Sequence, residues 1–156
     1  MKHYSFVFFK PDALERNLIE NMVGRFREEG LAIEFVGYQT VTEELMFAHY
    51  CEVIETLGDG FREKVRKAFR GKSVIPLILS AEDEHIIERV RKIVGATDPA
   101  AAEQGTLRGD YGRDRLETAM AENRMVNNLI HASDSREAFI REVRLWFGNK
   151  AEAFLV

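Results

Sequence analysis

Among the four histidines of this sequence, His131 stands in the setting best suited to chemistry. It follows the apolar pair Leu129-Ile130, so we expect it at the end of a strand, and a polar run from 133 to 135 follows it. An imidazole becomes a nucleophile when a carboxylate holds the proton of one ring nitrogen and leaves the other nitrogen free. Of the remaining histidines, His3 lies near the terminus, His49 in a predicted helix and His85 on an acidic helix face.

Glu142 is the candidate carboxylate, because it borders the apolar stripe of the last predicted helix. That stripe consists of Ala138, Phe139, Val143, Trp146 and Phe147. A carboxylate beside such a stripe needs a polar partner, and the imidazole of His131 suits it. Periodicity alone also allows a plainer interpretation, in which His131 is a hydrogen-bonded strand-end histidine and Glu142 is a surface charge.

An anion site is predicted beside His131. Asp134 and Glu137 have the spacing of a capping box, and the free amides at a helix start favour phosphate. A phosphate site also needs permanent cations, and the candidates are Lys10, Arg91 and Arg108. Each of these three, taken alone, could equally be a surface residue.

A second phosphate motif in the sequence is a false lead. Gly71-Lys72-Ser73 has the form of the end of a P-loop, but the motif requires glycine at position 66, where Arg66 stands. The segment also follows a predicted helix and precedes a strand, which reverses the order that a P-loop needs. We therefore do not place the phosphate site there.

The predicted elements alternate between strands and helices. Strands are expected over 4–9, 31–42, 74–79 and 125–130, and helices over 18–26, 43–56, 61–69, 86–94 and 135–147. Pro76 indicates that the third strand lies at an edge or carries a bulge. This order predicts an α/β (α+β) fold, a ferredoxin-like sandwich with a four-stranded antiparallel sheet covered by helices.

Composition limits the classes of protein to which the chain could belong. Its 156 residues suit a single domain over 1–156, and a net charge of −4 disfavours specific nucleic-acid binding. No apolar run is long enough to span a membrane. Cys51 is the only cysteine, and the first ten residues lack the pattern of a secretory signal, so we expect a cytoplasmic protein.

Several segments together resemble the nucleoside diphosphate kinase family. The strongest match is Asn128-Leu129-Ile130-His131-Ala132-Ser133-Asp134-Ser135, and further matches are the segments 10–13, 95–99 and 105–111. The resemblance extends from Tyr4 to Phe147. It implies transfer of the γ-phosphate of a nucleoside triphosphate to a nucleoside diphosphate, by a ping-pong mechanism through a phosphohistidine at His131.

The resemblance also implies roles for individual residues. Glu142 would orient His131, Ser133 would bridge the two through its hydroxyl, Tyr50 would stand near the phosphorylated ring, and Lys10 near the transferred phosphate. Nucleotide binding is implied for Lys10, Phe61, Arg91, Thr97, Arg108 and Asn128. Magnesium would be bound mainly through the nucleotide phosphates, with Asp134 reaching it through water, and the family implies a homo-oligomer, a tetramer or hexamer.

The sequence departs from the family pattern in three places. Ala132 replaces the glycine after the histidine. Gly58-Asp59-Gly60 and the following Phe61 stand where the base-stacking segment of the family usually has a different sequence. The stretch from 113 to 125 is longer than usual. Part of that stretch is expected to form a short helix, either as a tolerated surface insertion or at the nucleotide entrance or a subunit contact there. Two alternatives to an enzyme remain open: a non-catalytic nucleotide-binding relative and a ferredoxin-like interaction module.

Overall fold

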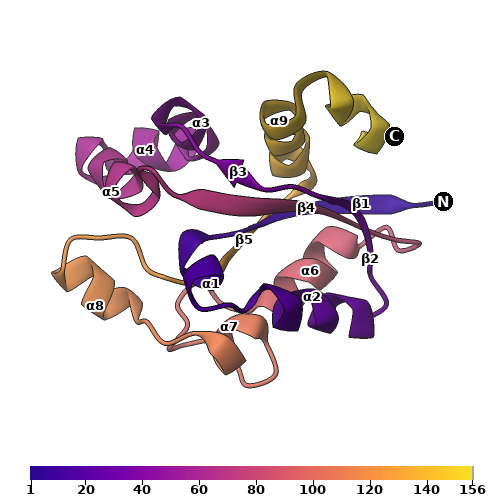
Figure 1. Ribbon diagram of the computed structural model, residues 1–156, viewed down its shortest axis with the longest axis horizontal. Coiled ribbons are helices and arrows are strands. Elements are labelled where there is room, and N and C mark those ends of the chain that lie inside the picture. Colours follow the sequence, from indigo (N-terminus) through magenta and orange to yellow (C-terminus); the bar gives the residue numbers. More distant parts are fainter. Residues whose placement is uncertain (156) are drawn as a thin grey trace.

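One antiparallel sheet crosses the middle of the structure (Figure 1). The computed structural model describes residues 1–155. The strand order is β2-β4-β1-β5, and the short β3 pairs separately with the start of β4. The strands are β1 His3–Phe9, β2 Ala32–Val36, β3 Gln39–Thr40, β4 Ser73–Ala81 and β5 Ile130–Ala132. The expected antiparallel sheet covered by helices is confirmed, with β3 as a small addition.

Helices cover both faces of this sheet. In Figure 1 the sheet is seen nearly edge-on, with α3 and α9 on one side and α1, α2 and α6 on the other. The helices are α1 Pro11–Glu15, α2 Ile19–Glu28, α3 Glu43–His49, α4 Cys51–Leu57, α5 Asp59–Phe69, α6 Ile86–Val94, α7 Leu107–Tyr111, α8 Leu116–Ala121, α9 Arg136–Phe147 and the 3₁₀ helix η1 Gly148–Phe154. Over residues 1–155, none of these helices combines the length and apolarity required to cross a bilayer.

The centre of the core is β1, which pairs with β4 on one side and β5 on the other. Its residues from Phe6 to Phe9 are completely buried, because helices lie over both faces of the strand. A strand buried on both faces has a continuous apolar sequence, as this one does, rather than an alternating one. The chain then continues directly from β1 to Lys10, which is itself buried.

Pro76 does not mark an edge strand, since β4 pairs with β1 and β2 at once. It instead lies where the partner strand is interrupted between β2 and β3, and its carbonyl accepts a hydrogen bond from Gly37 at 2.8 Å. A Cβ at position 37 would lie 3.0 Å from both the Pro76 ring and Phe35, so a larger residue there would have to displace these side chains. A proline without an N–H is tolerated here because the ladder on the β2–β3 side is interrupted at this residue, while the β1 ladder continues past it.

Two expected boundaries near His131 were wrong. The segment 125–129 is not a strand, because Leu129 adopts a positive φ of 74° and only Ile130–Ala132 pairs with β1. His131 is consequently in the middle of β5 rather than at a strand end. Helix α9 is capped by Ser135, whose hydroxyl accepts from the Ala138 amide at 3.0 Å, so Asp134 is not the capping residue.

Candidate active site

His131 projects from β5 into a cluster of aromatic rings. It lies opposite Phe8 in the β1–β5 ladder, and the two rings stack with centroids 5.0 Å apart. Phe8 is fully buried, so it provides a fixed surface against one face of the imidazole. Pairing on β5 and stacking on Phe8 together limit rotation of the catalytic candidate.

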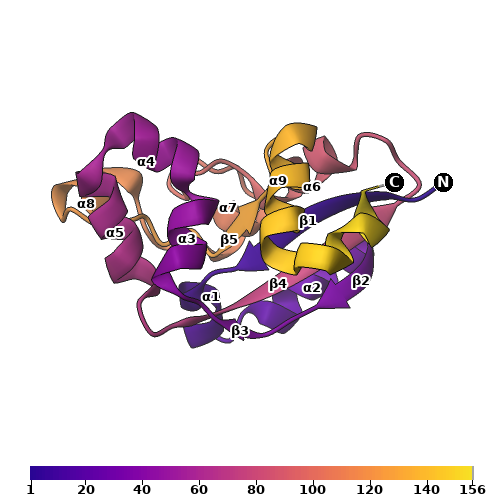
Figure 2. The same ribbon diagram turned by 90° about the horizontal axis from the view of Figure 1, so that it is seen from above.

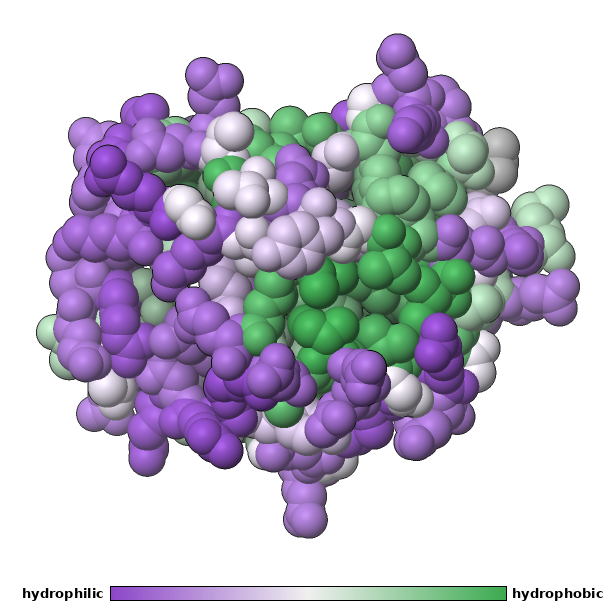
Figure 3. Space-filling view, in the orientation of Figure 1, coloured by the Kyte–Doolittle hydropathy of each residue, from purple (hydrophilic) through white to green (hydrophobic). Residues whose placement is uncertain are grey.

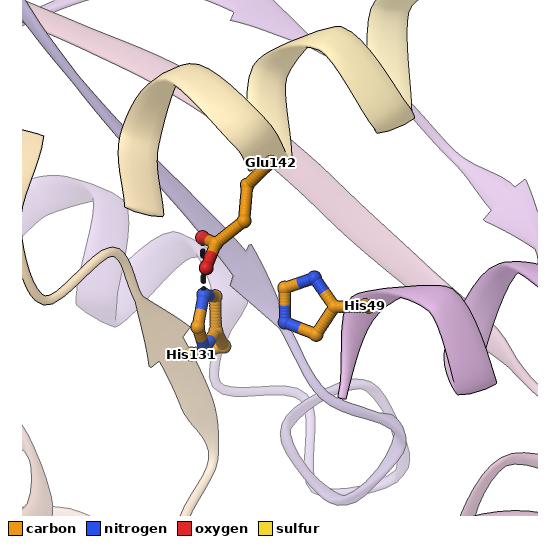
Figure 4. Close-up of side chains that lie close together, drawn as sticks. All are labelled: His49, His131 and Glu142. Carbon is orange, nitrogen blue, oxygen red and sulfur yellow. Dashed lines mark hydrogen bonds and ion pairs between the residues drawn. The ribbon is translucent and has the colours of Figure 1, made fainter. Parts of the chain in front are cut away.

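Glu142 bonds to His131 from the facing helix α9. One carboxylate oxygen, Oε1, lies 2.7 Å from Nε2 of His131, and the carboxylate is buried (Figure 4). The Ser133 hydroxyl donates to the same oxygen at 2.7 Å. The other oxygen, Oε2, lies 3.6 Å from Nη2 of Arg141. Because Oε1 accepts from Nε2, the remaining ring nitrogen Nδ1 is the free one, and no hydrogen bond reaches it within residues 1–155.

A cavity of about 550 Å³ opens beside this pair. It is lined by every residue for which the sequence implied a site role except Ser133, which lies behind Glu142: Lys10, Tyr50, Phe61, Arg91, Thr97, Arg108, Asn128, His131, Asp134 and Glu142. Residues far apart in sequence are therefore collected around one space. Arg66 and Gly71 line a separate, smaller hollow, so the false P-loop lies away from His131.

Hydrogen bonds to main-chain carbonyls and to the Asn128 side chain position the cations of the cavity. Lys10 donates to the side-chain oxygen of Asn128 at 2.9 Å, and Asn128 in turn donates to the Thr97 carbonyl at 2.9 Å. Arg108 donates to the carbonyls of Asn128, Gly95 and Ile130, which hold its guanidinium in one orientation. Arg91 donates to the Ala132 carbonyl at 3.2 Å and is otherwise exposed.

Burial governs the charges of these cations. Burial lowers the pKa of Lys10 to about 8, with the nearby Arg108 acting in the same direction. Burial and the neighbouring Arg91 likewise lower the pKa of Arg108 to about 10. The pKa of Tyr50 is raised, first by burial and then by Glu142, so its phenol stays neutral. Cations placed close together at low dielectric form a site prepared for an anion.

The insertion forms a wall of the cavity. Its helix α8 contributes Leu116 and Met120 to the lining, while Val53, Leu57 and Phe61 from α4 and α5 line it as well. Figures 1 and 2 both place α8 beside the α4–α5 end of the molecule. The exposed part of the lining, the mouth of the cavity, therefore gathers apolar side chains, with Lys64 and Arg124 beside them, whereas the cations Lys10 and Arg108 are buried deeper.

Ala132 fits the strand without strain. It lies in β5 opposite Val7, is buried, and has no positive φ. Its carbonyl accepts from Arg91, so the main chain at this position takes part in holding a cation. The methyl group that replaces the family glycine therefore lines the cavity without changing the course of the strand.

A family model of nucleoside diphosphate kinase matches residues 3–151. The chain belongs to the nucleoside diphosphate kinase family. The nucleoside diphosphate kinase of Staphylococcus epidermidis is 36% identical over 143 residues, which cover 92% of this chain and 86% of that protein. The Streptococcus pneumoniae enzyme is 33% identical over 144 residues, which cover 92% and 98%.

Solved structures of nucleoside diphosphate kinases have the same fold. The Borrelia burgdorferi enzyme, a transition-state mimic with bound vanadate and ADP, superposes with a TM-score of 0.88 at 28% identity, covering 96% of this chain and 89% of that one. The Pyrobaculum aerophilum kinase gives 0.85 at 27%, covering 97% and 98%. As a nucleoside diphosphate kinase, the chain is a transferase that moves phosphate between nucleotides.

Two residues near His131 were not anticipated. His49, placed by the sequence only in a predicted helix, is almost completely buried, and its ring centroid lies 4.4 Å from that of His131. Trp146, expected only as part of an apolar stripe, donates its indole N–H to Nδ1 of His49 at 3.1 Å. The signal available in the sequence was a histidine on an otherwise apolar helix face, which periodicity cannot distinguish from a core residue.

Proposed function

We propose that His131 is the phosphate acceptor of a two-step transfer between nucleoside triphosphates and diphosphates. The observation that carries the proposal is the 2.7 Å contact between Nε2 and Glu142, which directs Nδ1 away from the carboxylate and leaves it without a partner in the described chain. Glu142 keeps the proton on Nε2, so the lone pair of Nδ1 is available to attack phosphorus.

The proposed first step forms a bond between Nδ1 and the γ-phosphorus. The bond from that phosphorus to the bridging oxygen breaks, and the electron pair leaves with the nucleoside diphosphate. The Nε2 proton stays in its bond to Glu142, which balances the positive charge that the ring acquires. A second diphosphate then attacks the phosphorus, the bond from phosphorus to Nδ1 breaks, and the free imidazole is regenerated. Apart from the nucleophile itself, the protein contributes positioning and charge neutralisation.

The cations are proposed to hold the phosphate chain. Arg108, fixed by three carbonyls, and the more exposed Arg91 lie in the same lining, with Thr97 beside them. Lys10 and Asn128, which bond to each other, are proposed to contact the sugar hydroxyls, with Lys10 also near the transferred phosphate. Tyr50 is proposed to stand near the phosphorylated ring, with which it shares the cavity.

The apolar side chains of the mouth are proposed to receive the base. Phe61 lines one side and Met120 of α8 belongs to the same lining. Apolar and aromatic contacts accept any base, because every base has a flat face. This arrangement supports a kinase without a strong preference among bases.

Magnesium is proposed to arrive with the nucleotide. The described cavity lining offers a hard oxygen ligand in the exposed Asp134, whereas Glu142 is already bonded to His131 and Ser133. Asp134 and the exposed Glu52 are too few for an all-protein cage, which suits an ion that keeps several waters and binds mainly to phosphates. Bound there, magnesium would neutralise phosphate charge, with Asp134 reaching it through water.

The cellular setting and assembly are also proposed. We infer a single domain over 1–156 that acts in the cytoplasm as a homo-oligomer, a tetramer or hexamer. Support for assembly comes from β2, an edge strand that exposes Val36, and from the apolar patch that Figure 3 displays on the side of the molecule where β2 lies.

Labelling without an acceptor tests the proposed acceptor directly. Incubation with γ-labelled nucleoside triphosphate and magnesium should produce an acid-labile phosphoprotein, and His131→Ala should abolish it. His85→Ala is the matched control, because His85 is exposed and lies outside the cavity lining, and it should label as wild type does. Normal turnover by His131→Ala would overturn the assignment.

A further inference from the structure

His49 is the second histidine of the site, and the transfer steps proposed above do not use it. It ends helix α3 and is only 3% exposed. Its ring meets that of His131 at an interplanar angle of 86°, so one ring presents an edge to the other. In Figure 4 the outer edge of His49, away from its Cβ, points toward His131.

Trp146 determines where the proton of His49 lies. An indole N–H can only donate, so Nδ1 of His49, 3.1 Å away, must accept. Burial holds the pKa of His49 well below its ordinary value, and the nearby His131 acts in the same direction, so the ring is neutral. A neutral imidazole carries one proton, and in His49 that proton is therefore on Nε2.

This Nε2–H is a buried donor with no acceptor within the described chain. A donor in that condition costs free energy unless another state of the protein supplies an acceptor. A metal ion would not satisfy it, even though nitrogens of His49 and His131 and an oxygen of Glu142 lie within 4.8 Å of one another. A metal needs a lone pair, and at Nε2 that position holds the proton that Trp146 fixes there.

We propose that Nε2–H of His49 donates a hydrogen bond to the phosphoryl group carried by His131. The proposal rests on the proposed phosphohistidine. When the bond between Nδ1 and phosphorus forms and the diphosphate leaves with its electron pair, the new group places anionic oxygens beside a donor that had none to bond. His49 keeps its proton throughout, so it stabilises the phosphoenzyme without exchanging a proton.

Two variants separate the donor from the shape of the ring. His49→Phe keeps an aromatic ring against His131 but removes the donor and the acceptor for Trp146. His49→Gln keeps both functions, because an amide offers an oxygen to Trp146 and an N–H to the phosphoryl group. The measured quantity is the phosphorylated fraction, by intact mass spectrometry, at fixed ratios of ATP to ADP with magnesium.

We expect His49→Phe to shift this equilibrium toward the free enzyme by roughly 10- to 100-fold, the effect of losing one hydrogen bond to a charged group. His49→Gln should recover most of this shift. ADP affinity of the unphosphorylated enzyme should stay near the wild-type value in both variants, which a general disturbance of the fold would not allow. An unchanged equilibrium in His49→Phe would overturn the proposal.

The wild-type protein offers a second measurement that does not depend on how variants fold. In ¹⁵N-histidine spectra, His49 should be the tautomer with a proton on Nε2, and that proton should move to lower field after phosphorylation and removal of nucleotide. A proton on Nδ1, or a resonance that phosphorylation leaves unmoved, would overturn the proposal. Failure of wild-type protein to become phosphorylated would instead overturn the phosphohistidine itself, so the two failures are distinguishable.

Discussion

A single carboxylate oxygen controls the orientation of His131. Oε1 of Glu142 accepts from both Nε2 of His131 and the Ser133 hydroxyl, each at 2.7 Å. Two donors on one buried acceptor fix the carboxylate, and the fixed carboxylate then fixes the ring. Ser133 therefore supports the position of Glu142 without lining the cavity.

Glu142→Gln tests this control. The neutral amide no longer balances the charge that the ring acquires, and its N–H₂ end favours the wrong tautomer of His131. We expect phosphorylation by triphosphate in single-turnover mixing to slow by ~10²–10⁴-fold, the usual contribution of such a group, with ADP affinity little changed. Ser133→Ala, which removes one of the two donors, should show a smaller effect, and an unchanged rate in Glu142→Gln would reduce Glu142 to a structural residue.

Lys10 predicts an alkaline limit to activity. Its pKa is lowered from 10.5 to about 8, chiefly by burial. A plot of kcat/KM, which reports the free enzyme, should therefore fall as pH rises above about 8, because Lys10 then loses the charge that we propose holds phosphate. Lys10→Arg keeps its charge and should lack this limb while retaining activity below pH 8; a limb at the same pH in that variant would assign it to another group.

The effect of Lys10 on stability has the opposite sign. The folded protein loses this proton at about 8 and the unfolded chain only near the ordinary value of 10.5, so between these values the unfolded state binds more protons. The free energy of unfolding contributed by this group consequently rises with pH across that interval. Above pH 8, kcat/KM should therefore fall while the contribution of Lys10 to the free energy of unfolding rises. Denaturant titrations at several pH values measure the second quantity.

Among the elements, periodicity located the regular parts of the fold and missed the irregular ones. The buried run of β1 and the apolar spacing of α6 were sufficient to predict both elements. The break between α3 and α4 at Tyr50 was not predictable, because the residues around it favour a continuous helix. A positive φ at a leucine, as at Leu129, is likewise uncommon, and no local pattern announces it.

The strain at Leu129 also explains how the site residues meet. The Leu129 amide donates to the Asp12 carboxylate at 3.1 Å, and its carbonyl accepts from the Lys10 amide at 2.8 Å. The turn that connects Asn128 to β5 is therefore held by the segment that follows β1. The sequence supplied the residue types of the site, whereas these long-range bonds, which supply its geometry, become visible only in the fold.

Helix α8 is held at both ends, which makes it a fixed wall. The Leu116 amide donates to Asp98 at 3.1 Å, and Asp114 accepts from both the Arg124 guanidinium and the Asn127 amide. The hydrogen bond from Arg124, followed by that from Asn127, holds the pKa of Asp114 below its usual range. The insertion is therefore anchored beside Asn128 by charge and presents its apolar side to the cavity.

A double variant tests whether α8 contacts the base. Leu116→Ser with Met120→Ser removes apolar surface from the mouth and leaves the Asp114 anchor intact. We expect calorimetric titration to give roughly three- to tenfold weaker binding of nucleoside diphosphates, because less apolar surface then covers the base, and no change for inorganic diphosphate, which has no base. Glu117→Ser, on the same helix but outside the cavity lining, is the matched control; equal nucleotide affinity in both variants would make α8 a surface feature.

For the molecule as a whole, the sheet order explains both the site and the surface. Because β1 lies between β4 and β5, the ends of β1 and β5 meet, and Lys10 lies beside Asn128 although the two are far apart in sequence. The same order leaves β2 and β5 at the two edges. The edge strand β5 carries His131, whereas β2 carries no residue of the candidate site. Val36, the last residue of β2, and Tyr38 just beyond it are exposed.

An exposed edge strand with apolar side chains is a template for another chain, so we expect a second copy of this chain to cover β2. Val36 is 60% exposed and Tyr38 is 71% exposed, although both are large and apolar or aromatic. Val36→Lys with Tyr38→Ser should therefore reduce the mass measured by light scattering after size-exclusion chromatography, because a charge at the edge opposes pairing. Leu57→Lys, an equally exposed position at the cavity mouth, should leave the mass unchanged. Phosphorylation of His131 should persist in the smaller species, because β5 and α9 are untouched. A monomeric wild type, or a double variant with the mass of the wild-type protein, would show that β2 is not the contact.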